Sequence, residues 1–584
     1  MIPWSFGAII NISTVMNNLK STVERLGSLK EDEMKSKKTN TTKILFVAIL
    51  FLQLVCMFFY ANAKQGYFVD ELWSYGLANS YYHPDVGWNG ALQKGWVTGN
   101  YFHDYLRVLP NQRFAYGSVI YNQVYDYHPP LFYMVLHTIS SFFPNTFSKW
   151  YALIPNIIYF AISMLLLFAL AKRIFKNEWL ALVPVIAYGF SAGAISNVVF
   201  LRMYVLLTVW VLALMDLHVK WILNDRMQKK DFLLLVLVAY LGFMTHYYFF
   251  LIAFFTSAFY FFHLLFKKCF AVLVKYCVAM LAGLLLVEVT FPIAFLKLFS
   301  DQRGDEAVQN FFGVTDFVSH AKTFWNIMGE GIFANSINVI ALVLLIGGTV
   351  TVLSNCIRKK QQANKEYNPS VSALENDVDG SSVKGLCSSA NVEAQKTWIS
   401  IFCMSFVVVI YFVLISKIAP YLVDRYLFGV YPVIVLIVFF LLYEILYYWS
   451  TEKVSLIVML VLAFILALFG VSGKHVQYLY PENKDNVRIM EEHEGDTCLY
   501  ITNEQYMLIQ CALELEHMGM VIVGDPDNIE ASASRINTSK DEMIVYIPAG
   551  MDQDDTLRRV CATIGFTDWK PLFTSGYKAY ELTR

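Results

Sequence analysis

The chain has 584 residues, of which 57% are hydrophobic, and its net charge is −1 at pH 7. Few soluble folds carry so much apolar surface, and many of the apolar runs reach about 18 residues, the length that crosses a hydrocarbon core. The near-neutral charge argues against nucleic-acid binding, which needs a basic face. The nine cysteines are scattered without metal-ligand spacing. The composition therefore predicts an α-helical polytopic membrane protein.

The first 43 residues precede the apolar runs, and we find no cleavable signal peptide in them. A basic cluster stands immediately before the first run; it consists of Lys30, Lys35, Lys37, Lys38 and Lys43. Positive charge beside a first span is typical of the cytoplasmic side. We therefore expect residues 1–43 to be a cytoplasmic segment and the first apolar run to be an uncleaved anchor.

Eleven apolar runs are expected to be transmembrane helices: 44–61, 149–171, 179–198, 204–223, 232–246, 247–266, 271–297, 336–355, 397–418, 427–448 and 454–471. A further stretch, 129–143, begins with two prolines and is shorter than the about 20 residues of a spanning helix. If it is an interfacial helix on the outer surface, the basic clusters of the loops all face the cytoplasm. These clusters are Lys172-Arg173, Lys176, Lys220, Arg226, Lys229-Lys230, Lys267-Lys268 and Arg358-Lys359-Lys360.

This topology divides the chain into a transmembrane domain, 44–471, and a soluble region, 475–584. The first outer loop, 62–148, is far longer than a connector needs, which points to function. A second long outer loop covers 298–335. The polar stretch 358–396 has no apolar period and is typical of a disordered cytoplasmic loop. The soluble region is predicted to be a small extracytoplasmic α/β domain. Its expected elements are strands at 498–502, 520–523, 543–547 and 577–582 and helices at 503–518 and 552–564.

Two adjacent carboxylates, Asp70 and Glu71, follow the exit from the first span by a few residues, and aromatic residues surround them. A carboxylate beside a bilayer is costly to desolvate, so it stays in water or takes part in chemistry. An acidic pair in a loop is most often simply solvated. The membrane proximity and the aromatic surroundings favour a role in chemistry over simple solvation. Asp70 would then be a base that deprotonates an acceptor hydroxyl.

Two arginines and two histidines are expected on the same outer side. Arg202 and Arg425 each lie at the outer end of a span, where a guanidinium suits a phosphate well. The alternative for each is a snorkelling membrane anchor. His128 and His246 could donate hydrogen bonds to the same group, although a lone histidine is more often structural. Together these four groups could neutralise a departing phosphate.

At these residues the chain resembles the polyprenyl-phosphate-dependent membrane glycosyltransferases of the C fold. The resemblance is to glycosyltransferase family 39 and its bacterial relatives, which include protein O-mannosyltransferases and aminoarabinose transferases acting on lipid A. It covers roughly residues 44–470. It rests on the motifs Asp70-Glu71, Asp126-x-His128-Pro129-Pro130-Leu131, Arg202-Met203-Tyr204, Thr245-His246-Tyr247 and Arg425-Tyr426.

The resemblance implies an inverting transfer of a sugar from a polyprenyl-phosphate donor to an acceptor hydroxyl, at the extracytoplasmic face of the plasma membrane. Asp70 would be the catalytic base and Glu71 would orient the acceptor or the sugar. Arg202, Arg425, His128 and His246 would hold the donor phosphate, whereas the remaining motif residues would bind substrate. These substrate-binding residues are Asp126, Tyr204 and Tyr426.

The acceptor is expected to be an envelope glycan, lipid or protein. Protein mannosyltransferases continue their His-Pro-Pro-Leu motif with Gly-Lys, whereas this chain continues with Phe132-Tyr133. That departure argues against protein mannosylation and favours a bacterial envelope acceptor. The expected partners are thus the lipid-linked sugar, the acceptor and membrane lipids, with no nucleic acid. The scheme requires no cofactor or metal, although its carboxylates leave room for a divalent ion.

The main alternative is a membrane transporter or lipid-sugar flippase. That function predicts ionisable residues near the mid-plane of several spans. The candidates are Asp216, His218, His263 and Glu288. A third interpretation, a membrane scaffold whose outer domain recruits partners, would leave the long first outer loop unexplained.

Overall fold

The computed structural model describes residues 40–126, 128–296, 302–313, 316–366, 380–537 and 539–584. Nine helices of these residues are long and apolar enough to span a membrane. They are Asn40–Ala63, α6 (Trp150–Phe175), α9 (Tyr204–Asn224), α11 (Tyr248–Phe266), α12 (Phe270–Thr290), α16 (Ile337–Glu366), α17 (Gly380–Ile418), α18 (Tyr431–Trp449) and α19 (Glu452–Val471). A helix satisfies its backbone polar groups internally, as a hydrocarbon solvent requires. The predicted polytopic α-helical membrane architecture is thereby confirmed.

Two of the eleven expected spans differ from simple spanning helices. The run 179–198 is broken into α7 (Glu178–Gly189) and α8 (Ala192–Val199), which are bent by 59°. The Ser191 hydroxyl accepts the Ala194 amide at 3.2 Å and so begins α8 as a separate helix. The run 232–246 forms α10 (Lys229–Phe243), whose 15 residues extend about 22 Å. That is shorter than a hydrocarbon core of about 30 Å. The described residues therefore contain nine spanning helices, or ten with the bent pair, instead of eleven.

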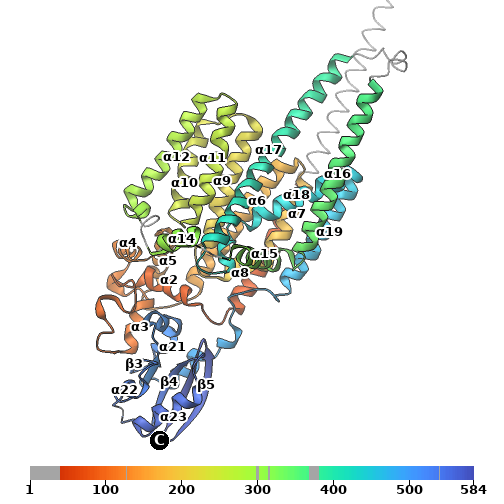
Figure 1. The fold of residues 1–584 in the computed structure, drawn as a ribbon. Helices are drawn as coiled ribbons and strands as arrows, with labels where there is room; N and C mark the ends of the chain where they lie inside the picture. Colours follow the sequence, from red (N-terminus) through yellow and green to blue (C-terminus); the bar gives the residue numbers. More distant parts are fainter. Residues whose placement is uncertain (1–39, 127, 297–301, 314–315, 367–379, 538) are drawn as a thin grey trace, which may run out of the picture.

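The first outer loop is folded into short helices between the helical bundle and the C-terminal sheet (Figure 1). Its elements are α2 (Val69–Asn79), η1 (Trp88–Gly90), β1 (Trp96–Val97), α3 (Gly99–Leu106), η2 (Pro110–Gln112), α4 (Tyr116–Val124) and α5 (Leu131–Phe142). Helix α5 is apolar but has only 12 residues. This length is too short to span a membrane, in agreement with the interfacial helix predicted for the stretch 129–143.

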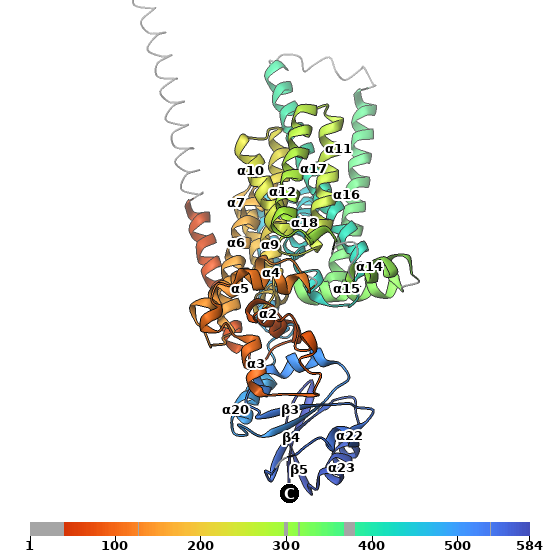
Figure 2. The same ribbon diagram turned by 90° about the vertical axis from the view of Figure 1, so that its left-hand side faces the viewer.

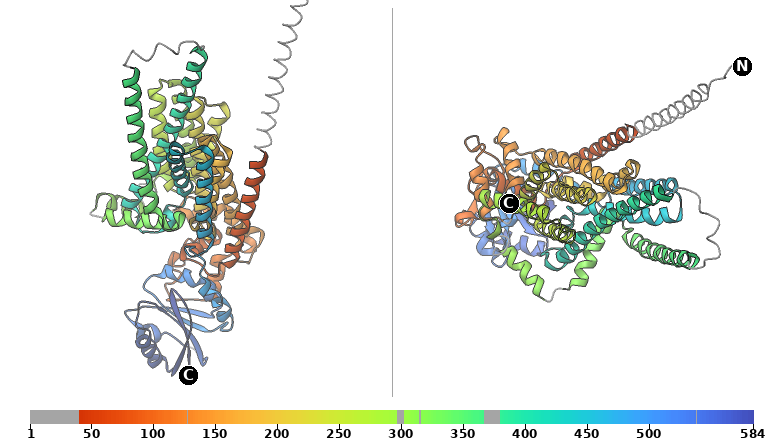
Figure 3. Two further views of the ribbon diagram at one scale, coloured as in Figure 1. Left: turned by 90° about the vertical axis from the view of Figure 1, so that its right-hand side faces the viewer. Right: turned by 90° about the horizontal axis from the view of Figure 1, so that it is seen from above.

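Three regions expected to lie outside the spanning helices are described only in part: the N-terminal segment 1–43, the second outer loop 298–335 and the stretch 358–396. The second outer loop contains α14 (Gln302–Phe312) and α15 (Phe317–Phe333), and α15 packs against α8 and α17. The stretch 358–396 was expected to be disordered, but α16 and α17 extend into it, so that 358–366 and 380–396 are helical. Residues 367–379 and residues 1–39 lie outside the described part. Figure 3 shows α16 at the edge of the bundle.

The C-terminal region forms a six-stranded sheet in the order β1-β3-β2-β4-β6-β5. Strands β3, β2 and β4 are parallel, and the outer pairs are antiparallel. The central strands are nearly continuous apolar runs, as strands buried on both faces require. The strands of this region are β2 (Thr497–Ile501), β3 (Met520–Gly524), β4 (Glu542–Pro548), β5 (Asp568–Ser575) and β6 (Tyr577–Thr583). Its helices are η4 (Pro481–Asn483), α20 (Asn486–Glu491), η5 (Gln505–Cys511), α21 (Ala512–Leu515), α22 (Ile529–Ala533) and α23 (Gln553–Ile564).

The sheet is joined to the first outer loop by backbone and side-chain bonds. Strand β1 belongs to that loop and pairs antiparallel with β3, so that Trp96 lies opposite Ile522. The Gly99 amide donates to the Met518 carbonyl at 3.0 Å. The Arg107 guanidinium also binds both carboxylate oxygens of Glu516. The C-terminal domain is therefore fixed against the loop that carries the predicted catalytic residues (Figure 2).

Candidate active site

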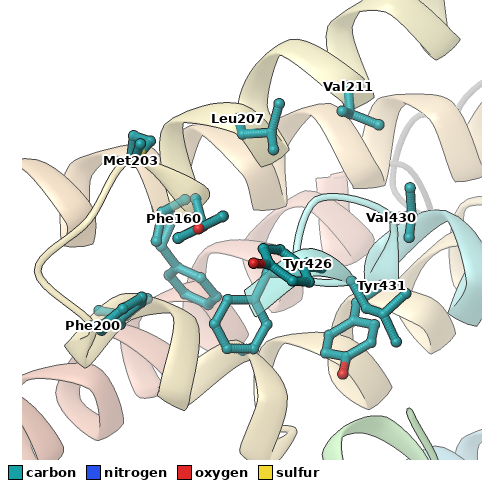
Figure 4. Packing of buried hydrophobic residues seen from close by; sticks show 14 of the residues in the cluster. Phe160, Phe200, Met203, Leu207, Val211, Tyr426, Val430 and Tyr431 are labelled. Carbon is teal, nitrogen blue, oxygen red and sulfur yellow. The ribbon is translucent and has the colours of Figure 1, made fainter. Parts of the chain in front are cut away.

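The predicted site residues come from turns at one end of the helical bundle. Arg202 lies in the turn between α8 and α9, and Arg425 lies in η3 (Asp424–Tyr426), just before α18. Buried apolar side chains pack these two turns together, among them Phe200, Met203 and Tyr426 (Figure 4). The two guanidinium groups are thereby brought to the same place from segments more than 200 residues apart.

Asp70 and Arg425 form an ion pair at the centre of the site. The Asp70 Oδ2 atom lies 2.8 Å from Nη1 of Arg425, and the side chains are 25% and 9% exposed. Asp70 is in the first turn of α2, where the helix dipole favours a negative charge. The Arg425 guanidinium lies 5.4 Å from the ring centroid of Phe68 and 5.7 Å from that of Tyr426. These contacts hold a carboxylate that remains partly open to solvent.

Arg202 is bound to the same helix from the other side. Its Nη1 atom donates to the Ser74 hydroxyl at 2.7 Å and to the backbone carbonyl of Asp70 at 3.2 Å. The same nitrogen lies 3.3 Å from the Tyr133 hydroxyl of α5. Arg202 is 4% exposed. It therefore serves both as a structural tie between α2 and α5 and as a buried positive charge.

His128 and Asp126 extend the site toward α5. The His128 Nδ1 atom lies 2.9 Å from the Asp126 carboxylate, and its Nε2 atom lies 3.3 Å from Nη2 of Arg202. Burial and the nearby Arg202 charge lower the pKa of His128 below its usual range. The neutral ring that results donates from Nδ1 to Asp126 and accepts at Nε2 from Arg202.

His246 lies opposite His128, in the turn between α10 and α11. The two ring centroids are 5.6 Å apart, and the Tyr204 ring lies 5.2 Å from that of His246. The Nδ1 atom of His246 accepts the Tyr248 amide at 3.0 Å. Burial, followed by the neighbouring cations, places the pKa of His246 well below its usual range. The neutral ring therefore carries its proton on Nε2.

Three nitrogen atoms of this cluster are buried without a hydrogen-bond partner among the described residues. They are Nε of Arg202, Nε of Arg425 and Nε2 of His246, and each carries a proton. Buried donors in folded proteins are almost always satisfied, so several in one site call for an explanation. A bound anion with several acceptor oxygens is such an explanation.

Glu71 occupies a different environment from the one that its expected catalytic role requires. Its carboxylate is fully buried and lies 2.9 Å from the Lys64 ammonium. It also accepts the amides of Phe68 and Leu201 at 2.7 and 2.8 Å. Enclosed by these donors, it has no access to an acceptor or a sugar. Its position is that of an anchor that ties the start of α2 to the turn preceding α9.

Several residues of the site were not singled out from the sequence. Lys64 follows an apolar run on the expected outer side, where lysine is uncommon, and this was a usable signal. Tyr478 gave no such signal because it lies in the connector after the last span. Its ring stacks on Phe200 with centroids 4.1 Å apart, its hydroxyl donates to Asp424, and its carbonyl accepts from Lys64 at 2.6 Å.

The site thus combines a partly exposed carboxylate, two guanidinium groups and two neutral imidazoles. Such a set can remove a proton from a hydroxyl and stabilise a phosphate that gains charge. Among the described residues, the side chains close enough to hold one metal ion together are His493, Asp496 and Glu542 of the C-terminal domain. The Lys540 ammonium already lies 2.6 Å from Asp496. The structure brings together all of the predicted site residues except Glu71, whose carboxylate is buried against Lys64 and the amides of Phe68 and Leu201.

No protein-family model and no curated protein sequence matches the chain. Solved structures match most of the chain at low sequence identity. ArnT from Cupriavidus metallidurans bound to undecaprenyl phosphate has a TM-score of 0.47 at 11% identity, covering 92% of this chain and 97% of that chain. Archaeal oligosaccharyltransferase AglB from Archaeoglobus fulgidus, in complex with an inhibitory peptide and a dolichol-phosphate, has a TM-score of 0.45 at 12% identity. That match covers 92% of this chain and 74% of that chain.

Proposed function

We propose that the protein is an inverting membrane glycosyltransferase that moves a sugar from a polyprenyl-phosphate donor to an acceptor hydroxyl of the cell envelope. One observation carries the proposal: Asp70 shares a site with buried nitrogen donors of Arg202, Arg425 and His246 that lack partners among the described residues. A carboxylate base beside a phosphate-binding cluster is what this reaction needs. In this proposal the site faces the extracytoplasmic side.

The proposed reaction proceeds by direct displacement. The acceptor oxygen attacks the anomeric carbon while Asp70 takes the hydroxyl proton. The bond between the anomeric carbon and the phosphate oxygen breaks, and polyprenyl phosphate leaves with the electron pair. Arg202 and Arg425 receive the charge that develops on the phosphate, and the Nε2–H of His246 donates to it. Tyr204, Tyr426 and Asp126 border the same space and are proposed to contact the substrates.

The Asp70–Arg425 ion pair gives this scheme an order of events. The ion pair occupies one carboxylate oxygen of Asp70, because Oδ2 accepts a guanidinium N–H of Arg425 at 2.8 Å. An arriving phosphate competes for the same guanidinium, because bidentate guanidinium–phosphate pairs are strong. Donor binding is therefore expected to loosen the ion pair and to free the Oδ2 atom of Asp70 for the acceptor hydroxyl. We infer that the donor binds before the acceptor is deprotonated.

A transporter function is less well supported by two of the four residues that it would use, Asp216 and His218. The Asp216 carboxylate, in the half of α9 that is farther from the site, lies 2.7 Å from the Arg173 guanidinium. His218 lies 2.7 Å from the Leu214 carbonyl and 2.9 Å from the Tyr276 hydroxyl. Both side chains are therefore engaged in contacts between helices.

The test is reconstitution of the full-length protein with a labelled polyprenyl-phosphate sugar in vesicles. We expect free polyprenyl phosphate to appear when envelope extract is added, together with labelled sugar on an extract component. Movement of the intact lipid across the bilayer without cleavage would favour the flippase instead. Neither cleavage nor movement in folded protein would argue against both functions.

A further inference from the structure

A cavity lies at the end of the bundle opposite to the candidate active site, away from the C-terminal sheet. Its volume is about 480 Å³, within the range of about 300–1,000 Å³ typical of ligand sites. It is formed where α6 and α9 end and where α17 passes them. The lining residues are Ala169, Lys172, Arg173, Lys176, Lys220, Leu223, Asn224, Glu393 and Lys396. Five of these nine are cations and one is an acid.

Each of the five cations is paired with an acid, and four of these acids do not line the cavity. Arg173 binds Asp216, Lys220 binds Asp231 at 2.6 Å, Lys396 binds Asp225, and Lys172 binds Glu178. The acids hold the cations in place, and Lys396 also donates to the Leu223 carbonyl at 3.1 Å. Each ammonium or guanidinium group has several N–H donors, so it can serve a further acceptor as well.

The one acid in the lining, Glu393, forms an exposed ion pair with Lys176. It lies 2.8 Å from Lys176, and the two side chains are 69% and 45% exposed. Exposed ion pairs of this kind contribute little free energy. A stronger anion can therefore displace Glu393 from Lys176 without disturbing the packing of the helices.

The position of the cavity indicates what kind of anion it takes. Four of the five cations lie in or next to the last turns of α6 and α9, at the ends of two spanning helices, and Lys396 lies in α17. Ala169 lies one turn deeper in α6 and, with Leu223, gives the cavity an apolar side. Basic pockets between transmembrane helices at the cytoplasmic side are suited to lipid phosphate head groups. The loop charges predict that this end of the bundle is cytoplasmic.

We propose that this cavity is a binding site for the phosphate head group of an anionic phospholipid of the inner leaflet, separate from the active site. Lys172, Lys176 and Arg173 hold the phosphate at the open side, and Lys220 and Lys396 hold it from the inner wall. The lipid phosphate takes the place of Glu393 on Lys176.

The test uses the full-length protein in phosphatidylcholine nanodiscs containing a minor fraction of phosphatidylglycerol. Native mass spectrometry counts the phosphatidylglycerol molecules retained after release. We expect Lys172→Gln/Lys176→Gln to retain the lipid roughly tenfold more weakly, because each lysine near the surface contributes measurably to anionic-lipid binding. Glu393→Gln is expected to retain more than the wild type, because the competing carboxylate is removed.

The matched control is Lys229→Gln/Lys230→Gln. These lysines are exposed at the same end of the bundle but do not line the cavity. Equal loss in both double variants would mean that the lipid senses general positive charge, and it would overturn the proposal. No gain in Glu393→Gln would also contradict it, and that variant remains informative if the lysine variant fails to fold. Displacement of the lipid by millimolar inorganic phosphate would assign the cavity to a soluble phosphate instead.

Discussion

At the residue scale, the proposed reaction depends on Asp70 as a proton acceptor. Asp70→Asn keeps the shape of the side chain and an oxygen that accepts from Arg425, but it removes the basic carboxylate. We expect sugar transfer to fall by about 10²–10⁴-fold, the usual contribution of a general base, whereas expression and donor binding persist. Transfer rates and donor affinity in the same vesicles provide the measurement.

Asp104→Asn is the control for that substitution, since Asp104 lies in the first outer loop with a half-exposed carboxylate, 2.9 Å from His103. It should leave transfer unchanged. Full transfer activity in Asp70→Asn would remove Asp70 from the mechanism.

Arg425 is expected to act through its guanidinium geometry and not only through its charge. Arg425→Lys retains the charge but loses the flat group that lies against Phe68 and Tyr426 and can bind phosphate bidentately. We expect donor affinity to fall on the order of 10- to 100-fold, equivalent to one or two charge-assisted hydrogen bonds. Binding of a fluorescent polyprenyl phosphate measures the change, and Arg488→Gln, an exposed arginine in α20, should have no effect.

The sequence identified the site residues better than it identified their contacts. Asp70, Arg202, His128 and His246 belong to short motifs next to span ends, and the structure places all four in one cluster. The burial of Glu71 depends on Lys64 and on backbone amides from distant turns, and spacing along the chain does not reveal such partners.

At the element scale, the start of α2 depends on the buried Lys64–Glu71 pair. Lys64→Met leaves the Glu71 carboxylate buried without its cation, a change that typically costs about 3–5 kcal/mol. We expect a lower unfolding temperature in detergent and a parallel loss of donor binding, because α2 carries Asp70. The double variant Lys64→Met/Glu71→Gln should recover part of the stability. No difference between the single and double variants would mean that the pair is not coupled.

The helix α21 gives the C-terminal domain a pH dependence. Burial raises the pKa of Glu514 to about 7. The folded state binds the proton of the Glu514 carboxyl more tightly than the unfolded state does. The contribution of Glu514 to the free energy of unfolding is therefore fully present below the ordinary glutamate pKa, and it is lost as the pH rises through about 7. The free energy of unfolding of the domain is expected to be lower at high pH than at low pH by on the order of 3 kcal/mol.

Hydrogen exchange in β2 and β3, corrected for the intrinsic exchange rate, measures this effect. We expect weaker protection at pH 8 than at pH 5.5, and Glu514→Gln should remove most of the difference. Glu491→Gln, an exposed carboxylate in α20, should leave it in place. Stronger protection at pH 8 would have the wrong sign for a buried acid.

Helices and strands differed in how well the sequence predicted them. Long apolar runs predicted most spanning helices to within a few residues, because length and hydropathy are local properties. Helices α16 and α17 extend more than ten residues beyond the predicted runs 336–355 and 397–418, into a polar stretch that has no apolar pattern. The bend between α7 and α8 and the short length of α10 were missed, since the apolar pattern continues through both regions. Strand β1 has two residues and exists because it pairs with β3, so its signal is in the tertiary structure.

At the scale of the whole molecule, the candidate active site is assembled from parts that are distant in sequence. The first outer loop supplies Asp70 and is fixed to the C-terminal sheet through β1 and the Arg107–Glu516 pair. The connector after the last span supplies Tyr478, which binds Asp424 beside Arg425. The C-terminal domain is therefore expected to be required for the geometry of the site.

The most direct test of the central claim is a structure of the full-length protein with polyprenyl phosphate bound. We predict the phosphate within hydrogen-bond distance of Arg202, Arg425 and Nε2 of His246, with the Asp70–Arg425 distance lengthened beyond the 2.8 Å of the ion pair. A phosphate bound away from both arginines, with that ion pair intact, would contradict the proposed function.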